Sequence, residues 1–358
     1  MSDRLDDDVL LLILDHLAMP STDCDVYLAS KKVLYNVCLG SSRLRRLAQP
    51  LLWRHIWVSD AGPVAALEHV PVESSIGRHT VSFKLGSTKY GGPPQRYAVE
   101  VIRFGPGRIL RILRREPVHI DIVGSFSNLR KLSLNDVDLD NSSLTVQLPH
   151  LDQLHIYDAR AFTATGALDW LRPCGLPALR ILSITAVTQA HTSLIQLDKV
   201  LDADLLAQLD VLQTDVAMVH PDSTIALGTA PPVLFFDPPD HKPTIPRHSV
   251  HPMQKATDVA GVSDIVFDVA DQVESTMASC AALGPRVVVF PRRVLKLSAQ
   301  HKDVGDAVRR LEQACGRAVR ILWSDEDDMD FTSGGVSREF VRYARELKAA
   351  QAADGLGA

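Results

Sequence analysis

Histidines in a proline-rich stretch come nearest to a metal-binding pattern in this sequence. His248 and His251 are separated by two residues, and His241 precedes them. Imidazole is a common zinc ligand, but a zinc site needs three or four protein ligands in a suitable geometry. No convincing carboxylate or cysteine partner accompanies these histidines. We therefore expect a loop here, and we expect the protein to hold no metal and no cofactor.

The cysteines do not indicate redox or zinc chemistry. The five of them are widely spread, odd in number and free of any Cys-x-x-Cys pair, and they are Cys24, Cys38, Cys174, Cys280 and Cys315. This pattern fits neither a disulfide framework nor a cysteine zinc site. The longest early apolar run, residues 9–14, follows three aspartates and resembles neither a signal peptide nor a membrane span. We expect reduced thiols, no membrane contact and a cytoplasmic or nuclear location.

Common catalytic motifs are missing from the sequence. It contains no Walker loop, no Gly-x-Ser-x-Gly elbow and no His-Glu-x-x-His pair. Gly105-Pro106-Gly107 is too short to hold a pyrophosphate and has no clear strand before it, which favours a turn. We expect that the protein is not an enzyme.

A basic cluster near the N-terminus raises a helix-turn-helix alternative, in which a third helix would enter a DNA groove. Its members are Arg43, Arg45, Arg46 and Arg54, with Lys31 and Lys32 nearby. Residues 1–60 nevertheless hold 7 Lys and Arg against 8 Asp and Glu, and the whole chain has a net charge of −5. We expect a solvated face and no nucleic-acid partner. The acidic run at residues 325–330 is interpreted as a charged loop, the alternative being a site for basic partners.

The composition is that of a soluble globular chain with a leucine-rich core. Of the 358 residues, 46% are hydrophobic and 23% are charged, which excludes collagen-like and wholly disordered classes. Only 6% are aromatic, so the core is built mainly from Leu, Val, Ile and Ala. This composition favours repetitive leucine packing.

The first 58 residues predict three short helices and a strand-like tail. Residues 6–17 form a helix that is apolar on nearly every side, and residues 25–37 resume a helical period. Ser41 or Ser42 caps a third helix over residues 43–49, which Pro50 stops. A helix at the end of a small module cannot bury its whole circumference, so one surface is expected to bind a partner.

The pattern Leu-x-x-Leu-x-apolar recurs in the middle of the chain. Its units are Leu129, Leu132 and Leu134; Leu151, Leu154 and Ile156; Leu179, Leu182 and Ile184; and, more weakly, Leu206, Leu209 and Val211. On a strand the last two positions of each unit point to one face, and stacked units bury a continuous leucine column. The ninth position, where Asn or Cys is usual in leucine-rich repeats, holds Val137, Ala159, Val187 and Thr214, so the repeats are degenerate.

Strands and helices alternate around and after these units. Strands are predicted at residues 80–85, 118–123, 233–236, 264–269, 286–290 and 317–323, and helices at 271–282, 304–314 and 336–351. Such alternation predicts a parallel sheet. A proline-rich region around residues 217–263 is expected to be loops around the one short strand at 233–236.

The N-terminal residues are similar to an F-box, in particular to the F-box-like modules of expanded fungal families. The resemblance covers residues 5–58 and is strongest over Leu44–Ile56, which reads LRRLAQPLLWRHI. Asp6 and Asp8 stand where that family usually has Pro and Glu. The resemblance implies a substrate-recognition subunit of a cullin-RING (SCF-type) ubiquitin ligase, whose F-box binds the adaptor and whose repeats bind a target protein.

The expected fold class is therefore α/β. A three-helix F-box-like module at residues 5–58 precedes a leucine-rich-repeat-like α/β solenoid with parallel strands at residues 59–358. The adaptor-binding positions implied by the resemblance are Leu5, Leu10, Ile13, Val37, Leu44, Leu51 and Trp53. The target-binding residues are unknown.

Two other functions remain open at this point. The alternation after residue 260 would also suit a catalytic α/β domain with titratable groups in one pocket beyond the strand ends. A scaffold without a ligase role is the other alternative. It predicts that Leu10 and Ile13 are buried against residues beyond 60.

Overall fold

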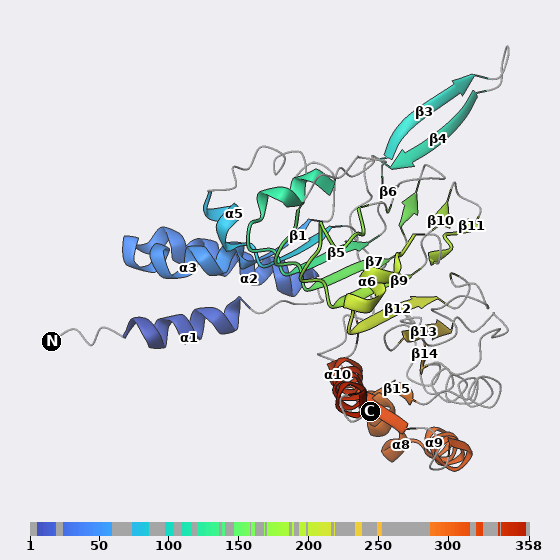
Figure 1. Ribbon diagram of the computed structural model, residues 1–358. Coiled ribbons are helices and arrows are strands. Elements are labelled where there is room, and N and C mark those ends of the chain that lie inside the picture. Colours follow the sequence, from blue (N-terminus) through green and yellow to red (C-terminus); the bar gives the residue numbers. More distant parts are fainter. Residues whose placement is uncertain are drawn as a thin grey trace. The chain divides into compact units, whose positions relative to one another are not determined.

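The computed structural model describes the chain in segments, and most of their helices and strands are labelled in Figure 1. The described residues are 6–18, 24–58, 74–85, 97–103, 109–115, 120–135, 138–139, 147–157, 159–161, 168, 170–185, 188–189, 193–197, 200–215, 218, 233–237, 249–252, 287–315, 320–324, 336 and 338–355. The chain divides into two compact units. The first is Met1–Leu154, Ala159–Trp170 and Cys174–Ala178, and the second is His155–Asp158, Leu171–Pro173 and Leu179–Ala358. The expected boundary at residue 58 lies inside the first unit and stays a prediction.

The first unit begins with helices and continues as short strands. Its helices are α1 (Asp7–Leu17), α2 (Cys24–Gly40), α3 (Ser42–Arg54), α5 (Ser75–His79) and the 3-10 helix η1 (Ile120–Ser125). Its strands are β1 (His55–Val58), β2 (Ser82–Leu85), β3 (Tyr97–Arg103), β4 (Ile109–Arg115), β5 (Lys131–Asn135), β6 (Asp138–Leu139) and β8 (Arg160–Ala161), and β7 (Gln153–Tyr157) is divided between the units. β1, β2 and β5 are parallel neighbours, as are β6 and β8, whereas β3 and β4 are antiparallel.

The second unit contains a six-stranded parallel sheet. Its strands are β9 (Ile181–Thr185), β12 (Val211–Asp215), β13 (Val233–Asp237), β14 (Ser249–Pro252), β15 (Val287–Pro291) and β16 (Arg320–Ser324), in that order across the sheet. Its helices are α6 (Ala203–Gln208), α8 (Arg293–Gln300), α9 (Lys302–Cys315) and α10 (Arg338–Gly355), and β10 (Thr188–Gln189) pairs antiparallel with β11 (Ser193–Leu194). The predicted combination of helices and parallel strands is confirmed.

The three N-terminal helices and the strand after them are confirmed, and we call α1, α2, α3 and β1 the N-terminal module. The Asp6 carboxylate caps α1 by accepting from the N–H of Asp8, and the Ser41 hydroxyl caps α3 by accepting from the N–H of Leu44. The buried residues between the helices are Leu14, Ala18, Leu34, Cys38, Leu47, Ala48 and Leu52.

The prediction that Pro50 stops the third helix is wrong. α3 continues through Pro50 to Arg54, and β1 begins at the next residue, His55. Proline lacks an N–H and removes one helical hydrogen bond. The last turn of α3 nevertheless buries Leu52 in the module core, with Leu51 and Trp53 half-buried beside it. We infer that this burial outweighs the missing hydrogen bond.

The leucine pattern coincides with strands in three of its four predicted units. The residues in the last two positions of those units are almost fully buried on β5, β7 and β9, and they are Leu132, Leu134, Leu154, Ile156, Leu182 and Ile184. The first positions, Leu129, Leu151 and Leu179, are buried two residues before each strand. The prediction that the last two positions of a unit lie on one buried face of their strand is confirmed for each of these three strands.

The fourth predicted unit is three residues out of register. Leu206 belongs to α6, and β12 begins only at Val211. Leu212 pairs with Leu182 of β9, so the matching unit is Leu209, Leu212 and Thr214. Thr214 is fully buried although it is polar. A search for an apolar residue in the last position therefore selects the wrong leucines.

The opposite face of these strands is also buried. The third residues of β5, β7, β9 and β12 are Ser133, His155, Ser183 and Gln213, and each is at most 3% exposed. Repeat solenoids use an extended concave surface for binding, whereas parallel sheets of α/β proteins are covered on both faces. The structure therefore shows an α/β arrangement of parallel strands, and the solenoid form stays a prediction.

Other predicted elements were found with shifted bounds, and a few were wrong. β2, β13, β15, β16, α9 and α10 match predicted strands and helices. Residues 120–123 of the strand predicted at 118–123 belong instead to η1. The carbonyl of Val123 accepts from the N–H of Phe126 three residues later, and both side chains are buried. β3 precedes Gly105, so the expected lack of a strand there is wrong, and β14 is a second strand within the proline-rich region. The predictions at 264–269 and 271–282 lie outside the described residues.

Polar groups join α2 to the beginning of β1. The Tyr27 hydroxyl accepts a hydrogen bond from the N–H of Trp57 at 2.9 Å and donates to the carbonyl of His55 at 3.4 Å. The Lys31 ammonium donates to the carbonyl of Leu52, and burial lowers the pKa of Lys31 to about 8. Burial also lowers the pKa of His55 to about 4, with further repulsion from the neighbouring cations Arg54 and Lys31.

The low pKa of His55 predicts acid sensitivity of the first unit. Between pH 6.5 and about 4 the unfolded chain binds a proton that folded His55 does not, so stability falls as the pH decreases through this window. The pKa difference corresponds to at most about 3 kcal/mol. We expect urea unfolding of His55→Gln to depend less on pH between 4 and 6.5 than unfolding of the wild type. His150→Gln, a change of an exposed histidine, should retain the full dependence. Equal pH profiles for wild type and His55→Gln would contradict the prediction.

The C-terminal helix is attached to the start of β12 in the second unit. Asp210 accepts from Arg345 at 3.0 Å and from Lys348 at 3.2 Å, and its side chain is only 14% exposed. Phe340 and Ala344 of α10 are buried with Val211, Val287 and Leu322. An ion pair with one largely buried partner and an apolar cluster therefore hold α10 against the strands.

Removing the carboxylate should weaken this attachment. We expect Asp210→Ala to lower the free energy of unfolding by about 1–2 kcal/mol, because two cations lose one largely buried partner. The measurement is urea unfolding with amide hydrogen exchange of α10. Glu346→Ala, on an exposed position of the same helix, is the control and should change stability by less than about 0.5 kcal/mol. Unchanged exchange of α10 in Asp210→Ala would contradict the proposed attachment.

Candidate functional site

Exposed apolar side chains gather on the first two helices. Among the side chains that the structure describes, the large apolar residues that remain exposed are Val9, Leu11, Leu12, Ile13, Val26, Leu28, Val33, Tyr35 and Leu39. All of them belong to α1 or α2, and Leu12 is 73% exposed. We call these nine residues the apolar helix surface. In α2 these residues lie on two sides, because helical spacing places Val26 and Val33 nearly opposite Leu28 and Tyr35. Large apolar side chains left exposed together on a small set of helices mark places that bind another protein.

Helical periodicity explains why α1 is apolar on two sides. Leu10, Leu14 and Leu17 follow the spacing i, i+4 and i+7 and pack into the module core. Leu12 and Ile13 lie off that stripe and remain exposed. The helix therefore carries one apolar face for its own core and a second one with no partner among the described residues.

Ion pairs hold α1 against α3. The Asp7 carboxylate lies 2.7 Å from Arg43 and 3.0 Å from Arg46, and Asp15 lies 2.6 Å from Arg54. The remaining arginine of the basic cluster, Arg45, donates from Nε to the carbonyl of Cys38 at 3.1 Å.

The expectation that the basic cluster forms a merely solvated face is therefore incomplete. Its arginines lie at or near the surface, but each of them also makes a contact inside the N-terminal module. Three of the four, Arg43, Arg46 and Arg54, are paired with aspartates of α1. Their charges are therefore poorly suited to a DNA groove, which weighs against the helix-turn-helix alternative.

The predicted adaptor-binding residues occupy two kinds of position. Ile13 is 51% exposed and belongs to the apolar helix surface. Four others are half-buried and pack against the module core, and they are Leu10, Val37, Leu51 and Trp53. Leu44 is half-buried, and Leu5 lies outside the described residues. Adaptor binding by these residues stays a prediction.

The sequence predicts that the helix at residues 6–17 keeps a second apolar surface for a partner, but the predicted adaptor-binding residues include only Ile13 of the apolar helix surface. Its missed members are Val9, Leu11, Leu12, Val26, Leu28, Val33, Tyr35 and Leu39. The signal that could have found them is the set of apolar residues left over once the core-facing stripe of each helix is assigned.

The structure describes few candidates for other chemistry. No group of three or more His, Cys, Asp or Glu side chains suited to a metal ion occurs among the described residues. His241 and His248 lie outside them, and His251 is placed only by its backbone in β14. Cys38 and Cys174 are free thiols, as expected. Within the described segments, the helices are too short or too polar to cross a bilayer.

Comparison of the chain with protein-family models, curated proteins and solved structures finds no match.

The pairing of α1 with α3 can be tested directly. We expect Asp7→Asn combined with Asp15→Asn to lower the stability of the module by about 1–2 kcal/mol, because three arginines lose their carboxylate partners. Hydrogen exchange of α1 amides is the measurement. Asp8→Asn is the matched control, because Asp8 is exposed and makes no ion pair in the described part of the chain. Protection of α1 equal in both variants would contradict the proposed role.

Proposed function

We propose that this protein is a non-catalytic substrate-recognition subunit of an SCF-type ubiquitin ligase. The N-terminal module binds the ligase adaptor, and the α/β body binds a target protein and holds it near the ubiquitin donor. Such a receptor acts by raising the effective concentration of the target, and it needs no catalytic residue of its own.

The apolar helix surface is the observation that carries this proposal. Exposed leucines and branched residues on adjacent helices suit a partner that offers an apolar groove or helix face. The resemblance of residues 5–58 to an F-box supplies the identity of that partner, the ligase adaptor. The core beneath the surface is complete without the adaptor, because Leu14, Leu34 and Leu52 are already buried.

The exposure of Ile13 weighs against the scaffold alternative. That alternative needs Leu10 and Ile13 to be covered by residues beyond 60. Ile13 is instead exposed, and Leu10 packs against a cluster drawn from residues 14–52. The first helix therefore has an apolar face available to another protein.

The finer architecture of the body is part of the same proposal. Backbone hydrogen bonds repeat at successive strands, which supports a repeat-like organisation: the carbonyl of one residue before a strand accepts two N–H groups from the start of the next strand, as in Val81 with Arg130 and Lys131, Arg130 with Asp152 and Gln153, and Arg180 with Asp210 and Val211. The strand faces at Ser133, His155, Ser183 and Gln213 are buried. In a solenoid of this kind the target would contact loops and strand ends.

Copurification with the adaptor subunit tests the proposed function. We expect the full-length chain to retain the adaptor, and Leu12→Asp combined with Leu28→Asp to reduce recovery about tenfold or more, because two apolar contacts are replaced by charges. Both residues are exposed, so the variant should keep the wild-type unfolding midpoint.

Ala349→Asp, on an exposed position of α10, is the control and should leave recovery unchanged. Failure of the wild-type chain to retain the adaptor would refute the proposal. Equal recovery with the double variant would exclude the apolar helix surface as the contact.

A further inference from the structure

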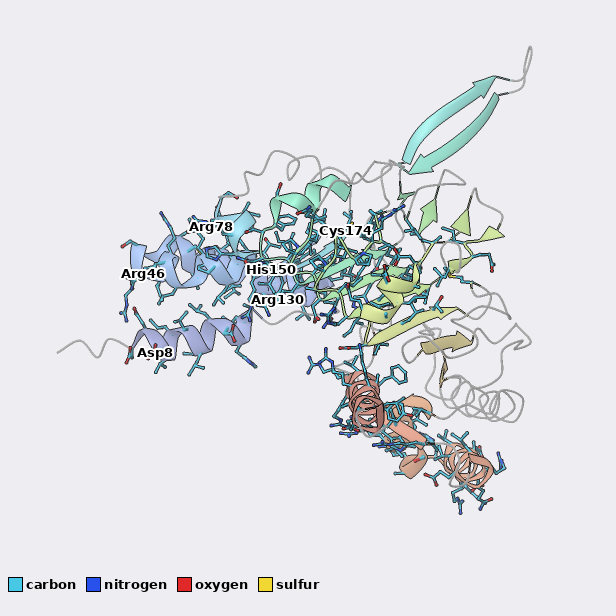
Figure 2. The ribbon with its side chains drawn as sticks, viewed as in Figure 1. Asp8, Arg46, Arg78, Arg130, His150 and Cys174 are labelled. Atoms are coloured by element: carbon cyan, nitrogen blue, oxygen red, sulfur yellow. The ribbon has the colours of Figure 1, made fainter. Side chains whose placement is uncertain are left out.

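A cavity of about 340 Å³ lies between α3, α5 and the residues that lead into β2 and β5. Three arginines line it, Arg54 from the end of α3, Arg78 from α5 and Arg130 from the position before β5. Figure 2 labels Arg78 and Arg130, which are contributed by segments about fifty residues apart in the chain. His79 adds an imidazole, and Leu51 and Val81 form an apolar part of the wall.

The described residues around this cavity carry positive charges and no negative one. No Asp or Glu is among the described residues that line it. Arg54 is paired with Asp15 at 2.6 Å, outside the lining. Within the described residues, neither Arg78 nor Arg130 has an ion-pair partner. In the part of the chain that the structure describes, two guanidinium groups therefore border the cavity with no carboxylate paired to them.

The backbone that carries these arginines is held by hydrogen bonds. Asn128 donates from Nδ2 to the carbonyl of Arg78 at 2.8 Å, and the N–H of Arg130 donates to the carbonyl of Val81 at 2.8 Å. The Thr80 hydroxyl, next to His79, bonds the carbonyl of Ile76 at 2.7 Å. Because these segments are fixed before a ligand arrives, less ordering is needed when it binds.

From this arrangement we propose that the cavity binds the phosphate group of a phosphorylated ligand. Guanidinium groups donate two parallel hydrogen bonds to an oxyanion, and a phosphate offers three oxygens to donors from several directions. Arg78 and Arg130 are the main contacts, and Leu51 and Val81 contact the group that bears the phosphate. This site does not depend on adaptor binding, so the experiment on the site and the experiment on the proposed function test separate claims.

Titration calorimetry of the full-length chain tests the site with three probes: inorganic phosphate, glucose 6-phosphate and a phosphoserine peptide. We expect saturable binding of at least one probe, and a Kd raised about tenfold or more by Arg78→Gln combined with Arg130→Gln. Preference for the sugar phosphate or for the peptide would support the site and identify the source of the phosphate.

Arg342→Gln is the matched control, because it removes the same charge from an exposed position of α10 in the second unit, and its Kd should stay within twofold of wild type. Each variant must keep the wild-type unfolding midpoint; should the double variant be destabilised, the single change Arg78→Gln replaces it, with an expected increase in Kd of about fivefold. Absence of saturable binding of all three probes, binding unaffected by these substitutions, or equal affinity for acetate at the same ionic strength would overturn the proposal.

Discussion

The direct passage from α3 into β1 is the constraint on which the rest of the first unit depends. Arg54 ends the helix and His55 begins the strand, so no loop lies between the two elements. The carbonyl of Arg54 accepts the N–H of Val81, and Val81 in turn accepts from the start of β5. The guanidinium of Arg54 pairs with Asp15 of α1 and borders the arginine-lined cavity. A rotation of the last turn of α3 would therefore disturb α1, the strand register and the cavity together.

The leucine strands and the end of α3 show where sequence reasoning succeeds and where it fails on the fold. Leu132, Leu154 and Leu182 could be assigned to strands because each is followed two residues later by another apolar residue, and one pleated face needs both. Leu209 and Leu212 could not, since burial of Thr214 depends on what packs over β12. Pro50 misled for a related reason. The hydrogen bond that Pro50 removes is outweighed by the burial of Leu52, and this burial is seen only once the helices are packed together.

The candidate site divides in a similar way. The resemblance to an F-box selects residues that the module needs in order to fold, and Leu10, Val37 and Trp53 indeed pack against its core. It does not separate the core face of α1 from the exposed face, because residues 9–14 are apolar without interruption and offer no polar contrast. The aspartates supply the missing information. Asp7 and Asp15 turn one side of α1 toward the arginines of α3, which leaves Leu12 and Ile13 on an outer side.

Charge acts at two scales in this protein, and the two lead to different conclusions. A net charge of −5 argues against a polyanion such as duplex DNA, whose affinity depends on the neutralisation of many phosphates at once. It says nothing of a single phosphate, which needs only two or three donors in one cavity. The aspartates of α1 neutralise Arg43, Arg46 and Arg54. Arg78 and Arg130, in contrast, come from segments without a nearby acidic partner among the described residues. Among the described residues, a local excess of positive charge thus arises from the fold, because the chain brings together arginines that are distant in the sequence.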